Sequence, residues 1–243
     1  AWCQAQEFSF DLSGNRKVEK GCTAITENCV YNDEQGYGYD LQPAPTSKSS
    51  APYFFSVKVP DGNYHVTVTL GSKKRAANTC VRGESRRLFI ENISTQKGEL
   101  KEFSFTINKR NPIINEKERV KIKPREKYKL NWDDKLTLEF NGDAPACSKI
   151  EIKRIEDTPT IFLCGNSTVV DQDNEPWASW GQMIPRFFTD KVCFANYAES
   201  RKCTIGIDDE GDISFMKKLL EEYKLKINQL KKGIEEAKQH EYR

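Results

Sequence analysis

The sequence predicts a β-sandwich over residues 6–156, followed by an incomplete α/β domain over residues 158–243. Three observations carry this prediction. The first part contains several short runs in which apolar and polar residues alternate, separated by turn signals. The pattern breaks at Asp157-Thr158-Pro159. Beyond this break, an apolar strand, a helix-compatible segment and a second apolar strand follow in order, which is typical of a βαβ unit.

The alternating runs indicate strands with one buried face and one polar face. The strong turn signal Pro60-Asp61-Gly62-Asn63 separates the first two runs, and Asn141-Gly142 ends the fifth. No helical pattern of comparable strength interrupts the set, so a sandwich of short strands is expected. The runs are 57–59, 64–70, 88–90, 103–107, 136–140 and 150–152.

The second part begins with a strand at residues 161–164, whose four apolar residues suit burial on both faces of a parallel sheet. A helix is expected over residues 181–188, with Pro185 in its first turn. The second strand is residues 192–195. Ligands of open α/β sheets bind beyond the carboxyl ends of such strands, where Ser167 would lie.

The C-terminal residues 213–243 predict a helix rich in lysine and glutamate. Its apolar residues recur at spacings of four and three over three heptads. This stripe fits an amphipathic helix that covers a sheet, or alternatively a coiled-coil surface for self-association.

Composition narrows the classes of partner. The 243 residues include 38 basic and 36 acidic side chains, a net charge of +2, which gives no reason to expect nucleic acid or an anionic membrane as partner. No apolar run is long enough to span a bilayer. Residues 1–5 resemble the remnant of a secretory signal around its cleavage site, so a secreted or periplasmic protein is expected.

The eight cysteines form no C-x-x-C pair, which weakens metal and redox readings. Cys22 and Cys29 could close a short loop in an oxidising compartment, and Cys80 with Cys147 is a looser alternative. Cys164 and Cys193 lie in apolar runs and are expected to be small buried hydrophobes.

Two segments resemble a known family. Residues 158–170, with Gly165-Asn166-Ser167-Thr168, look like the first block of the SGNH (GDSL-like) hydrolases. Residues 175–185, with Trp180-Gly181-Gln182, look like the branch that contains rhamnogalacturonan acetylesterases, and residues 196–200 resemble the start of the second block. Residues 36–40 and 131–134 resemble the galactose-binding-like domain that often precedes such esterases.

The resemblance implies an α/β flavodoxin-like hydrolase domain preceded by an accessory sandwich. Ser167 would be the nucleophile, and its backbone N–H would help to hold the oxyanion. The alternative for Ser167 is a helix N-cap after a strand. Arg201 stands where the family has a glycine that gives a second oxyanion N–H. The candidate contacts to a sugar are Trp180, Tyr37, Tyr39 and Trp132.

The family's remaining chemistry has no match in the sequence. The Gly-x-Asn-Asp block and the closing Asp-x-x-His block are absent, and Asn166 stands at the usual aspartate. Of the two histidines, His65 is expected on a strand facing solvent, and His240 lacks an aspartate three residues before it. We therefore expect a truncated esterase with weak or no turnover, and no cofactor or metal. The substrate would be an acetylated plant polysaccharide or oligosaccharide; the alternative function is a carbohydrate-binding module without catalysis.

Overall fold

The computed structural model describes residues 7–15, 18–46, 51–113, 116–117, 119–120, 122–199 and 221. The chain divides into two units, residues 1–201 and 202–243, and the first contains all the described residues except Glu221. Residues 1–5, Arg201, His240 and nearly all of the predicted helix at 213–243 therefore lie outside the described residues. Within the described part, no helix has the length and apolar character needed to cross a membrane.

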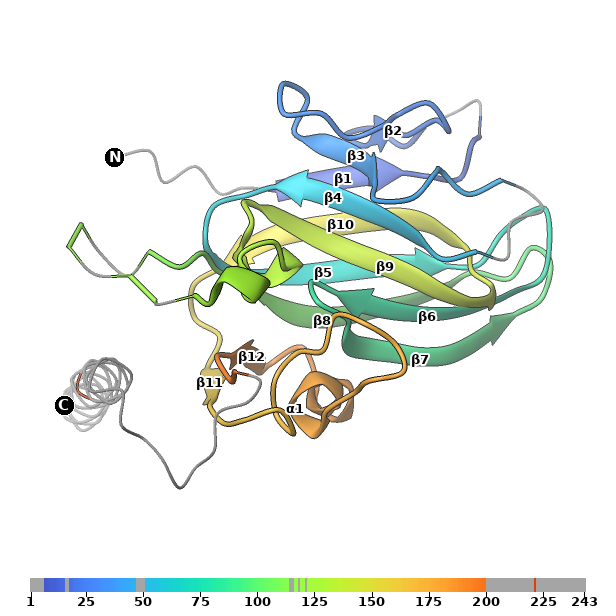
Figure 1. Ribbon diagram of the computed structural model, residues 1–243. Helices are drawn as coiled ribbons and strands as arrows, with labels where there is room; N and C mark the ends of the chain where they lie inside the picture. Colours follow the sequence, from blue (N-terminus) through green and yellow to red (C-terminus); the bar gives the residue numbers. More distant parts are fainter. Residues whose placement is uncertain are drawn as a thin grey trace, which may run out of the picture. The chain divides into compact units, whose positions relative to one another are not determined.

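Two five-stranded sheets form the body of the first unit (Figure 1). The first sheet has the strand order β2 (Thr23–Ala24), β1 (Glu7–Asp11), β10 (Cys147–Ile155), β5 (Gly62–Leu70) and β8 (Lys101–Lys109). The second has the order β3 (Tyr37–Asp40), β4 (Tyr53–Lys58), β9 (Lys135–Ala144), β6 (Ala77–Gly83) and β7 (Arg87–Thr95). Every pairing is antiparallel except β1 with β2.

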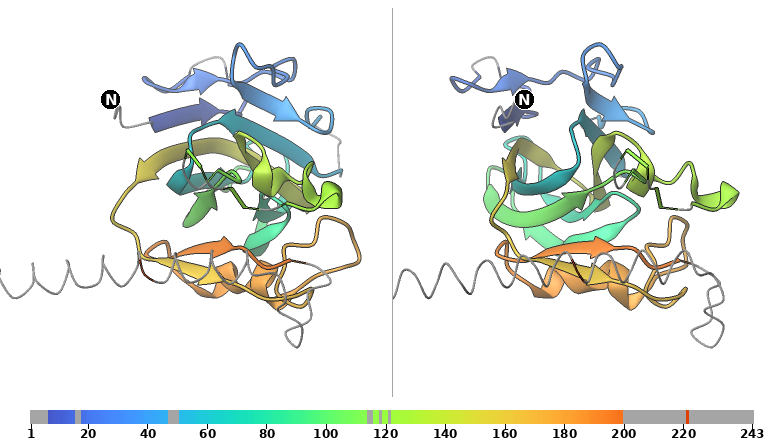
Figure 2. Two further views of the ribbon diagram at one scale, coloured as in Figure 1. Left: turned by 60° about the vertical axis from the view of Figure 1, so that its left-hand side comes forward. Right: turned by 90° about the vertical axis from the view of Figure 1, so that its left-hand side faces the viewer.

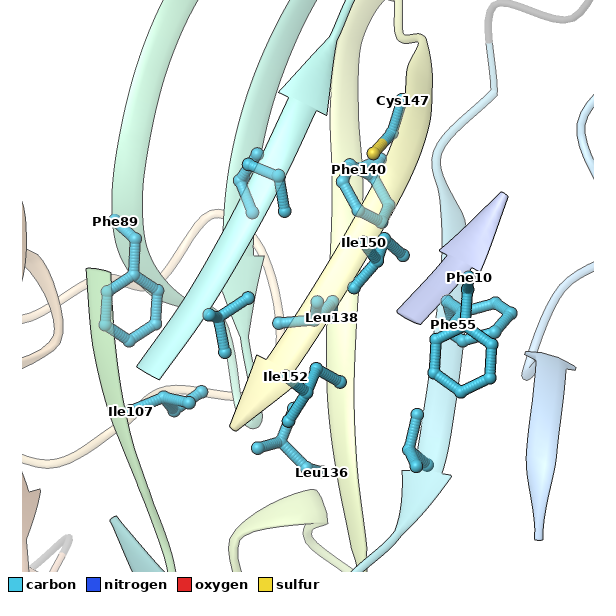
Figure 3. Packing of buried hydrophobic residues seen from close by; sticks show 14 of the residues in the cluster. Phe10, Phe55, Phe89, Ile107, Leu136, Leu138, Phe140, Cys147, Ile150 and Ile152 are labelled. Atoms are coloured by element: carbon cyan, nitrogen blue, oxygen red, sulfur yellow. The ribbon is translucent and has the colours of Figure 1, made fainter. Parts of the chain in front are cut away.

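One hydrophobic core lies between the two sheets (Figure 3). The period-two pattern explains it, because successive side chains of a strand point to opposite faces. In β5, Tyr64, Val66, Val68 and Leu70 are fully buried while the residues between them are part-exposed. Burying each such side chain stabilises the fold by about 1.5–3 kcal/mol relative to exposure. From the second sheet, Phe55, Leu136, Leu138 and Phe140 pack into the same core.

The predicted runs at 64–70, 88–90, 103–107, 136–140 and 150–152 all lie within observed strands, and Val57 lies in β4. Strand β6 has no counterpart among the predictions. Its inward residues are Ala77, Thr79, Val81 and Gly83, which are too small or too polar to give an apolar alternation. Small size is required at Gly83, where an added Cβ would lie 2.5 Å from the Ile107 side chain.

The predicted fold class is wrong, because the described residues that follow the two sheets form no α/β flavodoxin-like domain. The described residues after 158 form a two-stranded parallel sheet of β11 (Thr160–Leu163) and β12 (Cys193–Asn196). The connection holds the single turn of helix α1 (Trp180–Met183) and the 3-10 helix η3 (Ile184–Phe187). A doubly wound sheet has helices on both faces, and one four-residue helix cannot supply them.

This small parallel sheet packs against the two larger ones instead. Contacts join β12 to β8, and join α1 and η3 to β7. Strands β7 and β8 are the terminal strands of their sheets, so the segment lies along their open edges (Figures 1 and 2). Covering an edge removes unpaired backbone groups that would otherwise invite aggregation.

The predicted helix at 181–188 forms as two short pieces. Ser179 caps α1, its hydroxyl accepting a hydrogen bond from the Gln182 N–H at 3.2 Å. Pro185 has no N–H to give to the carbonyl four residues before it, so the α-helical ladder cannot pass this residue. The chain continues as η3, with Pro185 in its first turn.

The cysteines are arranged differently from the predictions. Cys22, Cys29, Cys80 and Cys147 are free, so neither suggested disulfide is formed. Cys193 is fully buried, as expected. Cys164 is exposed, because β11 ends one residue before it and the chain leaves the sheet there.

A strained turn joins β6 to β7 and buries a carboxyl group. Glu84 and Arg86 both adopt left-handed backbone conformations, with φ of 52° and 63°, which non-glycine residues rarely do. Glu84 is 2% exposed, and its Oε1 accepts a hydrogen bond from the Thr137 N–H at 3.1 Å. Burial raises the pKa of Glu84 to about 7, although nearby Arg87 and Lys109 oppose the shift.

We predict that Glu84 destabilises the fold as the pH rises. Its folded pKa lies above the ordinary glutamate value of 4.5, so the folded chain binds the extra proton and this contribution is lost between about pH 4.5 and 7. The free energy of unfolding of Glu84→Gln, minus that of the wild type, should increase by about 3 kcal/mol across this window. Urea unfolding at several pH values measures it.

Glu99→Gln is the matched control. Hydrogen bonds from the Gln96 N–H and from Lys101 lower the pKa of the Glu99 carboxyl, so its pH dependence has the opposite sign. A constant difference between Glu84→Gln and the wild type from pH 4.5 to 8 would contradict the prediction.

Candidate active site

Ser167 lies at the tip of a turn that follows β11. We call residues 164–171 the serine loop. The Asn166 side chain forms the turn, its Oδ1 accepting hydrogen bonds from the Thr168 N–H at 3.1 Å and the Thr168 hydroxyl at 2.9 Å. The Asn166 carbonyl accepts from the N–H groups of Val169 and Val170, both at 3.0 Å. Ser167 is exposed at this tip, and it is not a helix N-cap because the residues after it form a turn.

The chain beyond β12 holds the serine loop from one side. The Tyr197 N–H donates to the Leu163 carbonyl at 2.8 Å, and the Glu199 N–H donates to the Gly165 carbonyl at 3.0 Å. Asn196, which is 2% exposed, donates through Nδ2 to the Val169 carbonyl at 2.6 Å. The parallel pairing thus continues past both strands and fixes the start of the loop.

Asp171 ties the end of the loop to the two-sheet body. Its carboxylate accepts from Asn196 Nδ2 at 2.7 Å and lies 3.3 Å from Arg87 Nε. Both side chains of this ion pair are at most 1% exposed. Arg87 also donates to the carbonyls of Phe194 at 3.2 Å and Asn108 at 3.0 Å. Burial raises the pKa of Asp171, and the guanidinium of Arg87 opposes this shift.

Gln172 connects Ser167 itself to the body. Its Nε2 donates to the Ser167 carbonyl at 3.0 Å. The Gln172 carbonyl accepts in turn from Gln182 Nε2 at 2.7 Å and from Arg86 Nη1 at 3.3 Å. The backbone of the serine is therefore held, while its hydroxyl faces solvent.

No histidine accompanies Ser167 among the residues that the structure describes. His65, the one histidine in that part of the chain, lies on β5, half-exposed, with its Nε2 3.0 Å from the Asp190 carboxylate. Asp190 precedes β12, whereas Ser167 follows the carboxyl end of β11. Because β11 and β12 are parallel, the histidine and the serine lie at opposite ends of the small sheet. Ser167 Oγ has no hydrogen-bond partner in the described residues.

The candidate sugar contacts do not form one group. Trp180 is 52% exposed. Its backbone N–H donates to the Thr168 carbonyl at 3.1 Å, so Trp180 lies beside the serine loop. Tyr39 is 5% exposed and belongs to the core, and Tyr37 is partly buried against that core. Trp132, in the 3-10 helix η2 (Leu130–Trp132), lies near Tyr197 with ring centres 6.1 Å apart.

Two arginines that anchor this region were not among the predicted residues. The Arg110 guanidinium lies between the rings of Trp132 and Tyr197, at 5.0 and 4.7 Å from their centres, and donates to the Asn196 carbonyl. Arg87 and Arg110 each follow another basic residue, Arg86 and Lys109, at a strand end, and nothing local in the sequence separates them from solvent-facing basic residues. Their long-range partner Asp171 follows the apolar pair at 169–170, which was the one local sign of burial.

Comparison with known proteins gives one curated relative. An uncharacterized esterase, YxiM from Bacillus subtilis strain 168, is 26% identical over 244 residues, covering 88% of this chain and 56% of that protein. The chain thus spans about half the length of the relative it matches. No family model matches.

Two solved structures also align with this chain. The crystal structure of YxiM from Bacillus subtilis aligns with a TM-score of 0.40 at 22% identity, covering 86% of this chain and 59% of that one. The plant receptor-like kinase FER aligns with a TM-score of 0.39 at 10% identity, covering 65% and 44%.

We predict that Asp171→Ala strongly destabilises the chain, because it leaves Arg87 charged and buried without its partner. Removing one member of a buried ion pair costs about 3–5 kcal/mol. Asp173→Ala is the control, since 36% of the Asp173 side chain is exposed and its partner Lys129 keeps Glu126 at 3.8 Å, so its removal should cost about 0–1 kcal/mol. Urea unfolding of the two variants measures the difference, and equal losses would contradict a special role for Asp171.

Proposed function

We propose that this chain is an esterase-like protein of the SGNH type with Ser167 at the position of the nucleophile, that the polymer it serves is acetylated plant cell-wall polysaccharide such as rhamnogalacturonan, and that this chain by itself has weak or no turnover. The observation that carries the proposal is the serine itself. It is exposed at a turn after a parallel strand, with its backbone held by Gln172 and its neighbour Thr168 held by Trp180. The weak similarity to an esterase supports the same assignment, as do the resemblance of residues 158–170 to the family's first block and that of residues 175–185 to its rhamnogalacturonan acetylesterase branch.

The chemistry would follow the ordinary course of acyl transfer. Ser167 Oγ attacks the ester carbonyl carbon, and the proton of the hydroxyl passes to a base. The Ser167 N–H, which has no acceptor among the described residues, is free to donate to the oxyanion. Trp180, exposed beside the loop, offers an aromatic face to the substrate.

We further infer that residues 6–156 form the accessory domain of this esterase and that the protein acts outside the cytoplasm. An extracellular location fits a polymer substrate that cannot enter a cell. The signal-like residues 1–5 support it from the sequence side.

We predict that the 243-residue chain hydrolyses p-nitrophenyl acetate little faster than its Ser167→Ala variant, within about twofold, because a serine hydroxyl without a base is a poor nucleophile. Release of p-nitrophenol at pH 7.5 measures both rates. A loss of tenfold or more on mutation would show that the chain does supply a base to Ser167.

Acylation itself tests the assignment of the nucleophile. Prolonged incubation with p-nitrophenyl acetate at pH 9, followed by tryptic mass spectrometry, should find acetyl groups on Ser167 at least about fivefold more often than on Ser104. The Ser167 N–H has no acceptor among the described residues, whereas the Ser104 hydroxyl is hydrogen-bonded to Thr67 Oγ1 at 2.9 Å. Ser104 is an exposed strand serine and serves as the control. Equal acetylation of the two serines would refute a site built for acyl transfer.

A further inference from the structure

A cleft of about 360 Å³ lies on the outer face of the second sheet. We call it the sheet cleft. Its floor includes Phe54 on β4, Glu139 on β9 and Arg82 on β6, which are direct cross-strand partners in one row. Its walls come from residues 128–130, beside η2, and residues 173–175, which follow the serine loop. These three residues take no part in the chemistry proposed for Ser167, and they do not include the tyrosines of β3 that were considered as sugar contacts.

The floor of the cleft holds hydrogen-bonding capacity that the described residues leave unused. Glu139 is 4% exposed; its Oε1 accepts from Arg82 Nη1 at 3.2 Å and from Asn141 Nδ2 at 2.8 Å. Its Oε2 has no partner among the described residues, and neither does the hydroxyl of Ser85, which is 2% exposed. A buried acceptor without a partner costs free energy, so this site favours a ligand that donates hydrogen bonds.

The charges that line the cleft are already paired with one another. Arg82 lies 3.2 Å from Glu139 and 3.1 Å from Glu175, which Arg86 also contacts at 3.2 Å. The third cation, Lys129, lies 3.5 Å from the Asp173 carboxylate. Glu84, at the edge of the cleft, has a pKa that burial raises to about 7 and so carries only part of a charge at neutral pH.

Because these charges are paired with one another, the cleft has little net charge with which to attract an ion. They do leave both acceptor and donor groups, which hydroxyl groups satisfy because each hydroxyl donates and accepts. A cation is a poorer candidate, since the described residues contain no cluster of three or more metal-binding side chains.

The rim of the cleft is apolar. Tyr128 is 75% exposed and Leu41 is 52% exposed, both among the most exposed large apolar side chains of the described part. An aromatic ring at the mouth of a polar cleft can lie against the C–H face of a sugar ring while hydroxyl groups reach the floor.

We propose that the sheet cleft binds a neutral sugar ring of an oligosaccharide, with hydroxyl groups bonded to Glu139 and Arg82 and the apolar face against Tyr128. This site is separate from Ser167 and needs no catalysis. It would hold polymer beside the segment that leads out of the serine loop.

Isothermal titration calorimetry with the full chain tests the proposal, using β-1,4-galactotetraose, xylotetraose and mannotetraose as neutral probes and tetragalacturonate as the charged comparison. At least one neutral probe should bind, and Tyr128→Ala and Glu139→Gln should each weaken its binding about tenfold. Trp177→Ala, which removes an exposed aromatic outside the cleft, and Ser167→Ala should leave binding unchanged.

Several results would overturn the sheet cleft as a sugar site. These are no binding of any neutral probe, binding of tetragalacturonate alone, and neutral binding that survives Tyr128→Ala. Tyr128 is so exposed that its replacement does not endanger folding, so the test holds even if Glu139→Gln proves unstable. Because Ser167→Ala is measured for sugar binding and for ester hydrolysis separately, failure of one proposal is distinguishable from failure of the other.

Discussion

The guanidinium of Arg87 is the interaction on which the arrangement of this chain depends. Arg87 lies on β7. Its guanidinium pairs with Asp171, the last residue of the serine loop, and donates to the carbonyls of Phe194 on β12 and Asn108 on β8. One buried side chain therefore joins both large sheets, the small parallel sheet and the loop that presents Ser167. Burying a charge is costly unless it is paired and hydrogen-bonded, and Arg87 meets that condition only when all these parts are in place.

Because Arg87 needs partners from both, the parts of the chain before and after residue 157 depend on each other. The pattern of the sequence suggests a break near residue 157, yet the residues on either side share buried polar contacts. Asn63 donates to Thr160 at 2.7 Å, and Gln182 donates to the carbonyl of Ser85 at 2.9 Å. The large apolar core lies between the two large sheets, and a separate small cluster of Leu163, Val169 and Phe194 lies within the segment after residue 157, so these polar contacts link parts whose apolar clusters are distinct.

Sequence patterns predicted those features that follow from local periodicity. Strands with a long alternation of bulky side chains, such as β5, were predicted. Strand β6, whose inward residues are small, and the short strands β1 to β3 were missed. The turn bearing Ser167 was found because an apolar strand ends in Gly165-Asn166. The expected flavodoxin-like domain was wrong because a strand-helix-strand order says nothing about what the unit packs against. Arg87 and Asp171 are 84 residues apart, and no local pattern reports such a pairing.

The nature of the partners of Arg87 has a consequence for divergence. Two of them are main-chain carbonyls, at Phe194 and Asn108, and any amino acid supplies a carbonyl. The arginine therefore places no demand on the side chains at those two positions, and Phe194 is constrained only by its own packing in the small apolar cluster. Asp171 contributes a side chain, so Arg87 and Asp171 should be retained together or replaced together. An alignment of homologues should show this covariation even where the rest of the contact surface has diverged.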